Sequence, residues 1–454
     1  MALNRIRALW LDRAERAVWL AFLFALAWQT RVILWQADMA FIEWRAITLH
    51  ATDILLTMLW AGAVVRAAYG WRPHGRLRAW DTALIILALA ATASVSQAVL
   101  VPVAWAGVVR LLQGILLYAY VRWYASERFE PDVSVAAFVV GAFAQACLGI
   151  GQFVVQHDLG IRLAGETLLN PMMRGVAVFY DLAGEKTLRA YGTLPHPNVL
   201  AAMLVTAMFG YVYLYLRHAS ATVRRSWIPW VIIGAPLVWA LAATFSRTVV
   251  AATVIAVIVM LAATGSDRVS ARWPNISEIR KRIRALVVGA FVAMAVFTGL
   301  FWPQVLARAG ISSGEEAVVL RVFYNDIALN SGTGLFGVNW KGHGIGQFVS
   351  WLREANPHLP AWQYQPAHDL YLLVYTEIGI VGAAALAVFI VLLVRAVVSA
   401  KRTEPLVRWG LVTLMCLLVF IALFDHFTWT LQQGRMLWWL VFGAAAAVAT
   451  RRTS

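Results

Sequence analysis

The sequence contains a long succession of apolar segments, each close to the length that crosses a lipid bilayer. A membrane-spanning helix needs about 20 mostly apolar residues. Hydrophobic residues make up 61% of the chain and charged residues only 13%, whereas a soluble domain carries about 25% charged residues. We therefore expect an all-α polytopic membrane protein, folded as one integral membrane domain over residues 1–454. The predicted spans, about twelve in number, are residues 17–36, 46–66, 82–99, 101–121, 133–155, 198–216, 227–245, 248–264, 285–302, 369–394, 406–424 and 436–450.

The positive charge of the chain follows the predicted spans. The formal net charge is +15, and most lysines and arginines fall in alternate connections between spans. Cytoplasmic connections of membrane proteins are enriched in Lys and Arg, so we expect both chain termini in the cytoplasm. This topology explains most of the charge. We therefore expect the lipid bilayer, and no nucleic acid, as a partner.

Two connections on the opposite side of the predicted membrane are longer than ordinary loops. The smaller one covers residues 156–197, and the larger one covers residues 303–368, between spans nine and ten. Long loops inside a compact protein are often functional. We expect short helices on the outer surface in these regions rather than a separate domain.

Four polar segments on this outer side carry residues suited to an anionic substrate. They are residues 189–198 (RAYGTLPHPN), 244–248 (TFSRT), 320–326 (LRVFYND) and 365–373 (QPAHDLYLL). The planar guanidinium of arginine binds phosphate oxygens in pairs and stays charged. We therefore predict that Arg189, Arg247 and Arg321 bind a pyrophosphate at the level of the lipid headgroups.

His368 lies where the long polar stretch becomes a hydrophobic helix, and we predict that it is a catalytic base. Nearby arginines favour the neutral imidazole, which is the form that can accept a proton. Simpler interpretations exist: His368 as a polar residue at headgroup depth, Arg247 as a residue extending to phospholipid headgroups, and Arg321 as a solvated loop charge. No Asp-x-Asp or P-loop motif occurs. We therefore expect no metal and no cofactor.

Charged residues inside predicted spans are also candidates for structural or functional roles. Arg31 and Asp53 lie at similar depth in the first two predicted spans, and Arg110 and Glu377 lie at similar depth in spans four and ten. We expect an ion pair within each of these two sets.

In architecture and motif order, the chain resembles the O-antigen ligase and polymerase superfamily of bacterial inner-membrane glycosyltransferases. The resemblance rests on a set of short motifs: Arg189-x-x-Gly192 with Pro197-Asn198, Phe245-Ser246-Arg247, Arg321 followed by the glycine-rich turn 342–348, and Pro366-x-His368 with Gly379-x-x-Gly382. One departure is Asp369, where many members have Asn. It adds a carboxylate beside the proposed base.

The resemblance implies a GT-C-like glycosyltransferase that works at the periplasmic face of the inner membrane. The donor would be O-antigen linked to undecaprenyl pyrophosphate, and the acceptor of a ligase would be the lipid A–core oligosaccharide. The transfer would be inverting and independent of metal, with His368 as the base and Arg189, Arg247 and Arg321 on the pyrophosphate. The alternatives within the superfamily are an O-antigen polymerase and a protein O-oligosaccharyltransferase. A lipid-linked sugar transporter or flippase is an alternative of another class.

Overall fold

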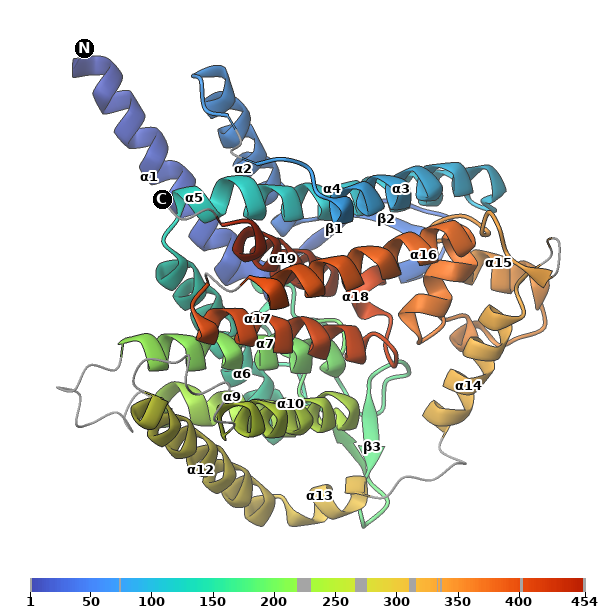
Figure 1. Cartoon of the computed structure of the whole chain (residues 1–454). Coiled ribbons are helices and arrows are strands. Elements are labelled where there is room, and N and C mark those ends of the chain that lie inside the picture. Colours follow the sequence, from blue (N-terminus) through green and yellow to red (C-terminus); the bar gives the residue numbers. More distant parts are fainter. Residues whose placement is uncertain are drawn as a thin grey trace.

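The computed structural model describes most of the chain, and Figure 1 shows its course. The described residues are 2–72, 75–218, 230–265, 276–309, 316–332, 334, 337–400 and 403–451. Parts of the predicted loop 303–368, namely 310–315, 333 and 335–336, therefore lie outside the described residues. The described part is mostly helical and contains two small antiparallel sheets of two strands each.

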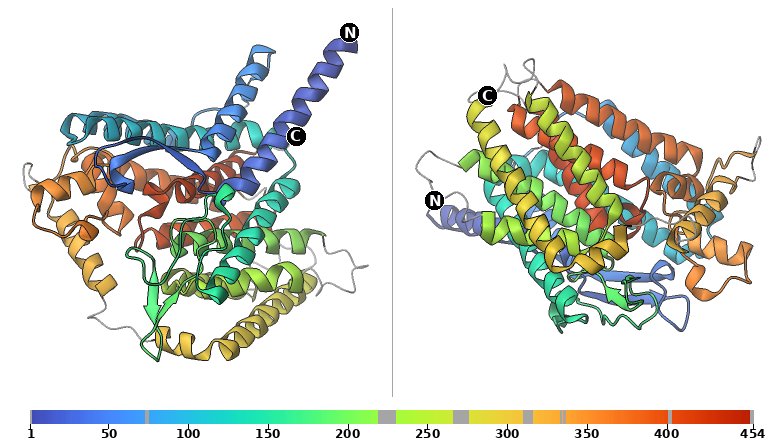
Figure 2. Two further views of the ribbon diagram at one scale, coloured as in Figure 1. Left: turned by 180° about the vertical axis from the view of Figure 1, so that it is seen from behind. Right: turned by 90° about the horizontal axis from the view of Figure 1, so that it is seen from below.

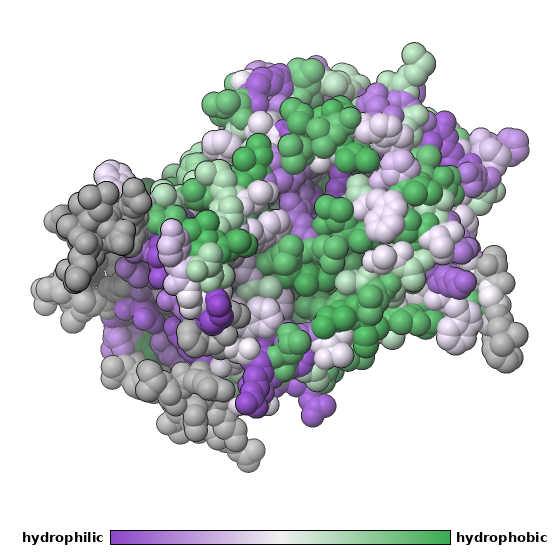
Figure 3. Space-filling model, turned by 90° about the horizontal axis from the view of Figure 1, so that it is seen from above, coloured by the Kyte–Doolittle hydropathy of each residue, from purple (hydrophilic) through white to green (hydrophobic). Residues whose placement is uncertain are grey.

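Seven described helices are long and apolar enough to cross a membrane, which supports a multi-pass membrane protein. They are α2 (Ala51–Ala68), α3 (Ala79–Ser94), α4 (Val101–Tyr120), α6 (Pro131–Val155), α7 (Pro197–His218), α12 (Ile276–Leu300) and α16 (Leu370–Ser399). Three further apolar stretches are shorter: Val231–Ala243, which ends with α9 (Ala235–Ala243), Arg247–Val259 in α10 (Arg247–Gly265), and α17 (Pro405–Ile421). The first and last predicted spans overlap α1 (Ala2–Phe24) and α19 (Gln432–Thr450). Viewed from above, much of the surface is hydrophobic (Figure 3).

The long helices pack side by side into a bundle with the chain termini at one end. Both termini lie at the end opposite α14 (Glu316–Leu329) and α15 (Phe348–Ala355), as Figures 1 and 2 show from several sides. α16 packs along α3, and α4 packs along α19. The Phe389 ring of α16 lies 5.6 Å from the Phe442 ring of α19 and 5.7 Å from the Tyr118 ring of α4, between ring centroids. Close packing of this kind is what holds helices together in lipid.

The first two predicted spans are wrong at their adjoining ends, where the chain forms a β-hairpin. β1 (Arg31–Gln36) pairs antiparallel with β2 (Ala46–His50). The helical part of the first predicted span ends at Ala27, and Trp28 is already extended. The run from Val32 to Trp35 is rich in β-branched and aromatic residues, which favour a strand. The segment is as hydrophobic as the end of a membrane helix, which is why hydrophobicity alone predicts a longer span.

The predicted ion pair between Arg31 and Asp53 is also wrong. Arg31 Nη1 lies 2.7 and 2.6 Å from the two carboxylate oxygens of Glu43, in the same hairpin. Asp53 occupies the first turn of α2, and its carboxylate accepts a hydrogen bond of 2.9 Å from the backbone N–H of His50. A carboxylate at this position satisfies a donor that the helix leaves unpaired. Arg31 therefore pairs within its own hairpin and Asp53 caps its own helix, and the two residues do not pair with each other.

The larger of the two long polar connections contains short helices, as expected, whereas the smaller one contains mainly a β-hairpin. The connection before α7 holds a hairpin of β3 (Val178–Tyr180) and β4 (Lys186–Leu188). The larger one holds α13 (Trp302–Ala309), α14 and α15. Of these elements, α14 and α15 pack against α16.

α16 is broken near its first third, and a glycine-rich turn completes the break. Gly379 has φ 85° and ψ 179°, which is not helical. The backbone N–H groups of His343 and Gly344 donate hydrogen bonds of 2.9 Å to the carbonyls of Thr376 and Glu377, which lie just before the break. The turn thus supplies donors that the interrupted helix no longer provides.

Candidate functional site

One large cavity is lined by residues from all four sequence segments that are predicted to bind an anionic substrate. Its volume is about 510 Å³. Arg189, Arg247, Arg321 and His368 all line it. The other lining residues are Glu43, Trp44, Val176, Ala177, Val178, Pro195, His196, Asn198, Phe245, Ser246, Thr248, Arg308, Leu320, Gln365, Asp425, His426, Phe427 and Leu431. The cavity therefore contains four arginines and three histidines drawn from distant parts of the chain.

Each predicted residue reaches the cavity from a different part of the fold. Arg189 directly follows β4, and Arg247 is the first residue of α10. Arg321 lies on α14, and His368 precedes α16 by two residues. Three of the four residues thus lie where an element begins or ends, and Arg321 lies within α14.

Arg189 is fixed by two hydrogen bonds to neighbouring segments. Its Nε donates to the Thr244 carbonyl at 2.6 Å, and its Nη2 donates to Asn198 Oδ1 at 2.9 Å. The next residue, Ala190, donates its N–H to the Ala243 carbonyl at 2.9 Å. These contacts join the segment 189–198 to the end of α9 and hold the buried guanidinium at the wall of the cavity. An arginine has five N–H donors, so two bonds leave others for a ligand.

Asp425 is the principal site residue that the sequence analysis missed. It follows α17, it lines the cavity, and its Oδ2 accepts a hydrogen bond of 2.6 Å from Asn198 Nδ2. Burial alone would raise the pKa of its carboxyl group. The neighbouring histidines His426, His196 and His368 and the bond from Asn198 outweigh burial and lower the pKa. Asp425 is therefore a buried carboxylate beside the three histidines.

His368 is buried among aromatic and imidazole rings. Its ring stacks on the Tyr324 ring at 5.8 Å and meets the His426 ring edge-on at 5.3 Å, between centroids. Its Nδ1 is buried and has no hydrogen-bond partner among the described residues. Burial, followed by the charge of His426, lowers the pKa of His368 to about 3. The imidazole is therefore neutral near pH 7.

Asp369 has a structural role at the start of α16. Its Oδ1 accepts hydrogen bonds from the backbone N–H groups of Tyr371 at 2.8 Å and Leu372 at 3.1 Å. The backbone N–H of Asp369 donates a hydrogen bond of 3.2 Å to Oδ1 of Asn325 in α14. The carboxylate that departs from the family pattern therefore caps the helix that carries His368, and α14 is tied to the same junction.

His426 and Arg308 are further cavity residues that the motif search did not select. His426 Nδ1 lies 2.7 Å from Thr430 Oγ1, and its ring meets the Trp44 ring edge-on at 5.3 Å. Arg308, on α13, lines the same cavity as Arg189 and Arg321. Asp425 and His426 directly follow the predicted span 406–424, but no motif surrounds them to mark them as site residues. Arg308 had only its position after a span to mark it.

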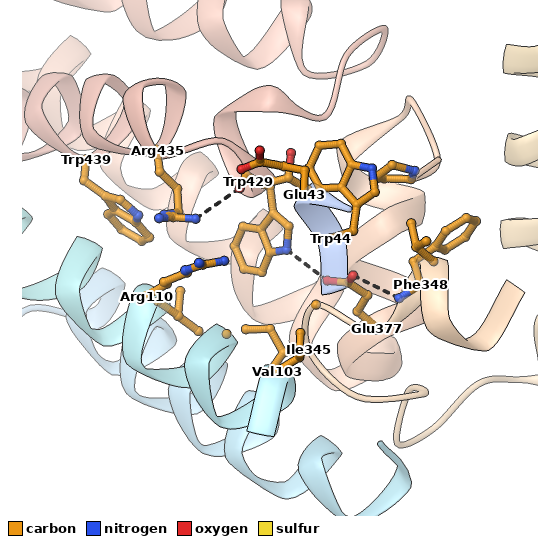
Figure 4. Close-up of a pocket in the computed structure, with 16 residues that line it drawn as sticks. Glu43, Trp44, Val103, Arg110, Ile345, Phe348, Glu377, Trp429, Arg435 and Trp439 are labelled. Carbon is orange, nitrogen blue, oxygen red and sulfur yellow. Dashed lines mark hydrogen bonds between the residues drawn. The ribbon is translucent and has the colours of Figure 1, made fainter. Parts of the chain in front are cut away.

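A second, smaller cavity of about 60 Å³ adjoins the large one (Figure 4). Arg110 and Glu377 both line it, but the predicted ion pair between them is wrong. Arg110 Nη2 donates to Thr48 Oγ1 at 3.1 Å. Glu377 accepts hydrogen bonds from the Phe348 N–H at 3.3 Å and the Trp429 indole N–H at 3.2 Å. Neutral donors lie nearer to the carboxylate than the arginine does, so they take the place of the expected partner.

Comparison with known proteins identifies no relative. No family model matches the chain, and no curated protein sequence is similar to it. Among the described residues, no group of three or more His, Cys, Asp or Glu side chains is arranged to hold a metal ion.

Proposed function

We propose that this protein is an O-antigen ligase. It would transfer O-antigen polysaccharide from undecaprenyl pyrophosphate to a sugar hydroxyl of lipid A–core. The observation that carries the proposal is the cavity in which Arg189, Arg247, Arg321 and His368 meet in a multi-pass membrane protein. The order of the motifs in the sequence supports the same assignment.

The arginines suit the donor because negative charge grows on the leaving pyrophosphate. Fixed cations aimed at that charge stabilise the transition state more than the ground state. Arg189, Arg247 and Arg321 come from three separate segments, and the hydrogen bonds to Thr244 and Asn198 orient Arg189 before any ligand binds. In this proposal they bind the two phosphates, and Arg308 adds a fourth positive charge to the wall.

His368 suits the acceptor side of the reaction. The acceptor oxygen forms a bond to the anomeric carbon, and the bond from that carbon to pyrophosphate breaks. The electron pair of the broken bond leaves with undecaprenyl pyrophosphate, and the hydroxyl proton passes to His368. Attack from the face opposite the leaving group inverts the anomeric centre. The buried carboxylate of Asp425 would stabilise the imidazolium that forms.

The proposed topology places this reaction at the periplasmic face of the bacterial inner membrane. It comprises about twelve spans in a GT-C-like arrangement, with both termini in the cytoplasm and the loop helices on the far side. That the termini and α14 lie at opposite ends of the bundle supports this orientation. The activated donor supplies the free energy of transfer, and both lipid substrates enter from the side.

Reconstituted transfer with a choice of acceptors tests the proposal. The purified protein in detergent receives lipid-linked glycan together with lipid A–core, a second lipid-linked glycan, or an acceptor peptide, in the presence of EDTA. We expect glycan joined to lipid A–core, and we expect that His368→Ala abolishes the product. Glycan joined only to a second lipid-linked glycan identifies a polymerase, and glycan joined only to peptide identifies a protein O-oligosaccharyltransferase. Movement of the donor between leaflets of vesicles without any product identifies a flippase.

A further inference from the structure

The smaller cavity contains two arginines inside the helical bundle, and no donor-binding role has been given to them. Arg110 lies midway along α4, and Arg435 lies in the first turn of α19. Both line the cavity of about 60 Å³, and Figure 4 shows the two guanidinium groups beside the Trp429 indole. Arginine within a membrane-spanning segment is costly and is most often functional.

The hydrogen-bonding capacity of the two arginines is only partly used. Arg435 is 5% exposed; its Nη1 donates to the Thr430 carbonyl at 3.2 Å and its Nη2 to Gln432 Oε1, but its buried Nε has no partner among the described residues. Arg110 has Thr48 Oγ1 as its acceptor. Since each guanidinium has five N–H donors, most of those on Arg110 remain for a ligand.

The nearby carboxylates are already engaged by other groups. Both oxygens of Glu43 bind Arg31, at 2.7 and 2.6 Å. Glu377 accepts from the Phe348 N–H and the Trp429 indole. Within the part of the chain that the structure describes, neither Arg110 nor Arg435 has a carboxylate within salt-bridge distance. Two like charges therefore face one small cavity, an arrangement that a bound anion stabilises.

We propose that this cavity is a second anion subsite, which binds a phosphate or carboxylate between Arg110 and Arg435. Its volume takes about four water-sized groups, which matches the four oxygens of a phosphate. Trp429 supplies an apolar wall beside the two guanidinium groups, and charge-assisted hydrogen bonds in apolar surroundings are stronger than in solution.

The subsite lies on the acceptor side of His368, and this assignment rests on the proposed function. Glu43 and Trp44 line both cavities, and Pro366, two residues before His368, lines the small one. Arg189, Arg247 and Arg321 line the large cavity alone. The anion is therefore carried by the acceptor glycan, whose reacting hydroxyl points to His368. The subsite would select acceptors with an anionic group close to that hydroxyl.

Direct binding tests the subsite without any transfer reaction. Equilibrium dialysis with radiolabelled inorganic phosphate is performed on the detergent-solubilised wild type, Arg110→Gln, Arg110→Lys and Arg435→Lys. Arg395→Gln serves as the control, because Arg395 is an exposed arginine at the far end of α16. We expect Arg110→Gln to lose one bound phosphate per chain, and the two lysine variants to keep it with weaker affinity. Phosphate binding by folded Arg110→Gln that equals the wild type would overturn the subsite.

Transfer kinetics then decide the source of the anion. The wild type and the same variants are compared on lipid A–core and on its dephosphorylated form. We expect Arg110→Gln to lower the preference for the phosphorylated acceptor about tenfold, whereas Arg395→Gln keeps it. Equal losses on both acceptors would refute the acceptor assignment and leave a lipid headgroup or free phosphate as the ligand. If the wild type transfers nothing, the proposed function fails while the dialysis result still decides the subsite.

Discussion

Asn198 donates a hydrogen bond of 2.6 Å to Asp425 across 227 positions of the chain. The same asparagine accepts a hydrogen bond from Arg189 through its other side-chain atom. One amide group therefore connects a cation that lines the cavity to a buried carboxylate, and it fixes the start of α7 against the end of α17. Both charged groups depend on it for their orientation.

Asn198→Leu keeps the size of the side chain and removes both hydrogen bonds. Buried polar groups left without a partner cost about 1–3 kcal/mol each. We expect the free energy of unfolding to fall by at least that amount and the transfer rate to fall about tenfold or more. Asn330→Leu is the matched control, because Asn330 is exposed and bonds only within α14 and its end. Thermal unfolding and transfer rate measured together check the prediction, and equal values for the two variants would contradict it.

Arg321→Lys tests whether the arginines bind the donor with paired hydrogen bonds. Lysine keeps the charge but lacks the planar fork. We expect kcat/KM for the donor to fall about 10- to 100-fold, since a hydrogen bond to a charged group contributes about 1.5–3 kcal/mol. Donor titration at fixed acceptor measures the effect. Arg353→Lys, at an exposed surface ion pair with Asp38, should retain full kcat/KM. An unaltered kcat/KM in Arg321→Lys would remove Arg321 from the donor site.

The transfer rate should not depend on pH near the usual pKa of histidine. Burial, with the charge of His426, lowers the pKa of His368 to about 3, so the imidazole stays neutral and able to accept a proton as pH falls through 6.5. We expect kcat/KM to be constant between about pH 5 and 8 and to decline only as the pH approaches the lowered pKa. A profile of kcat/KM against pH checks this. An inflection near pH 6.5 that is absent from the uncatalysed controls would show that His368 titrates normally.

Stability should fall in acid because the folded chain holds its histidines neutral. Burial, with the charge of Arg189, lowers the pKa of His196 to about 3, whereas the unfolded chain binds a proton near pH 6.5. Full stability is therefore present above about pH 6.5, and it is lost as pH falls from there toward the lowered pKa, by roughly 1.4 kcal/mol per pH unit for each such histidine. Thermal unfolding between pH 8 and 5 measures the slope. His196→Gln should make that slope shallower, and an identical slope would refute the assignment.

Gly379→Ala should separate the glycine-rich turn from α16. A Cβ at this position would lie 2.4 Å from the Trp340 carbonyl oxygen, and φ of 85° is strained for any other residue. We expect a loss of several kcal/mol in unfolding free energy, together with loss of transfer, because His368 lies on the same helix entrance. Gly299→Ala is the control, since its Cβ would meet nothing within 4 Å. Thermal unfolding of both variants tests the contrast.

The gathering of the four motif residues was within reach of the sequence. Charge asymmetry places their segments on one side of the predicted membrane. The span ends on that side all lie at the same membrane surface. Residues at those ends, such as Arg247 and His368, are therefore expected to lie close together. In the structure both line the same cavity. The functional roles assigned to them stay predictions.

Asp425 and the first hairpin were out of reach for different physical reasons. Asp425 stands in a short connection that has no motif around it, and its importance comes from Asn198, 227 positions earlier. In β1, Val32 and Trp35 are as hydrophobic as a membrane helix, and only the pairing with β2 decides the strand. Arg31 pairs with Glu43 of the same hairpin. This contact depends on the geometry of the turn between the strands, which the sequence pattern does not specify.

The break at Gly379 restricts how ligands can travel. The carbonyls of Thr376 and Glu377 accept hydrogen bonds from the backbone N–H groups of His343 and Gly344 in the turn. Loss of the turn would leave the Glu377 carbonyl without this partner inside an apolar helix, where an unsatisfied backbone group costs several kcal/mol. Displacement of the turn is therefore costly. Under the proposed function, a lipid-borne glycan would enter and leave laterally between neighbouring helices, and the speed of that passage would limit turnover.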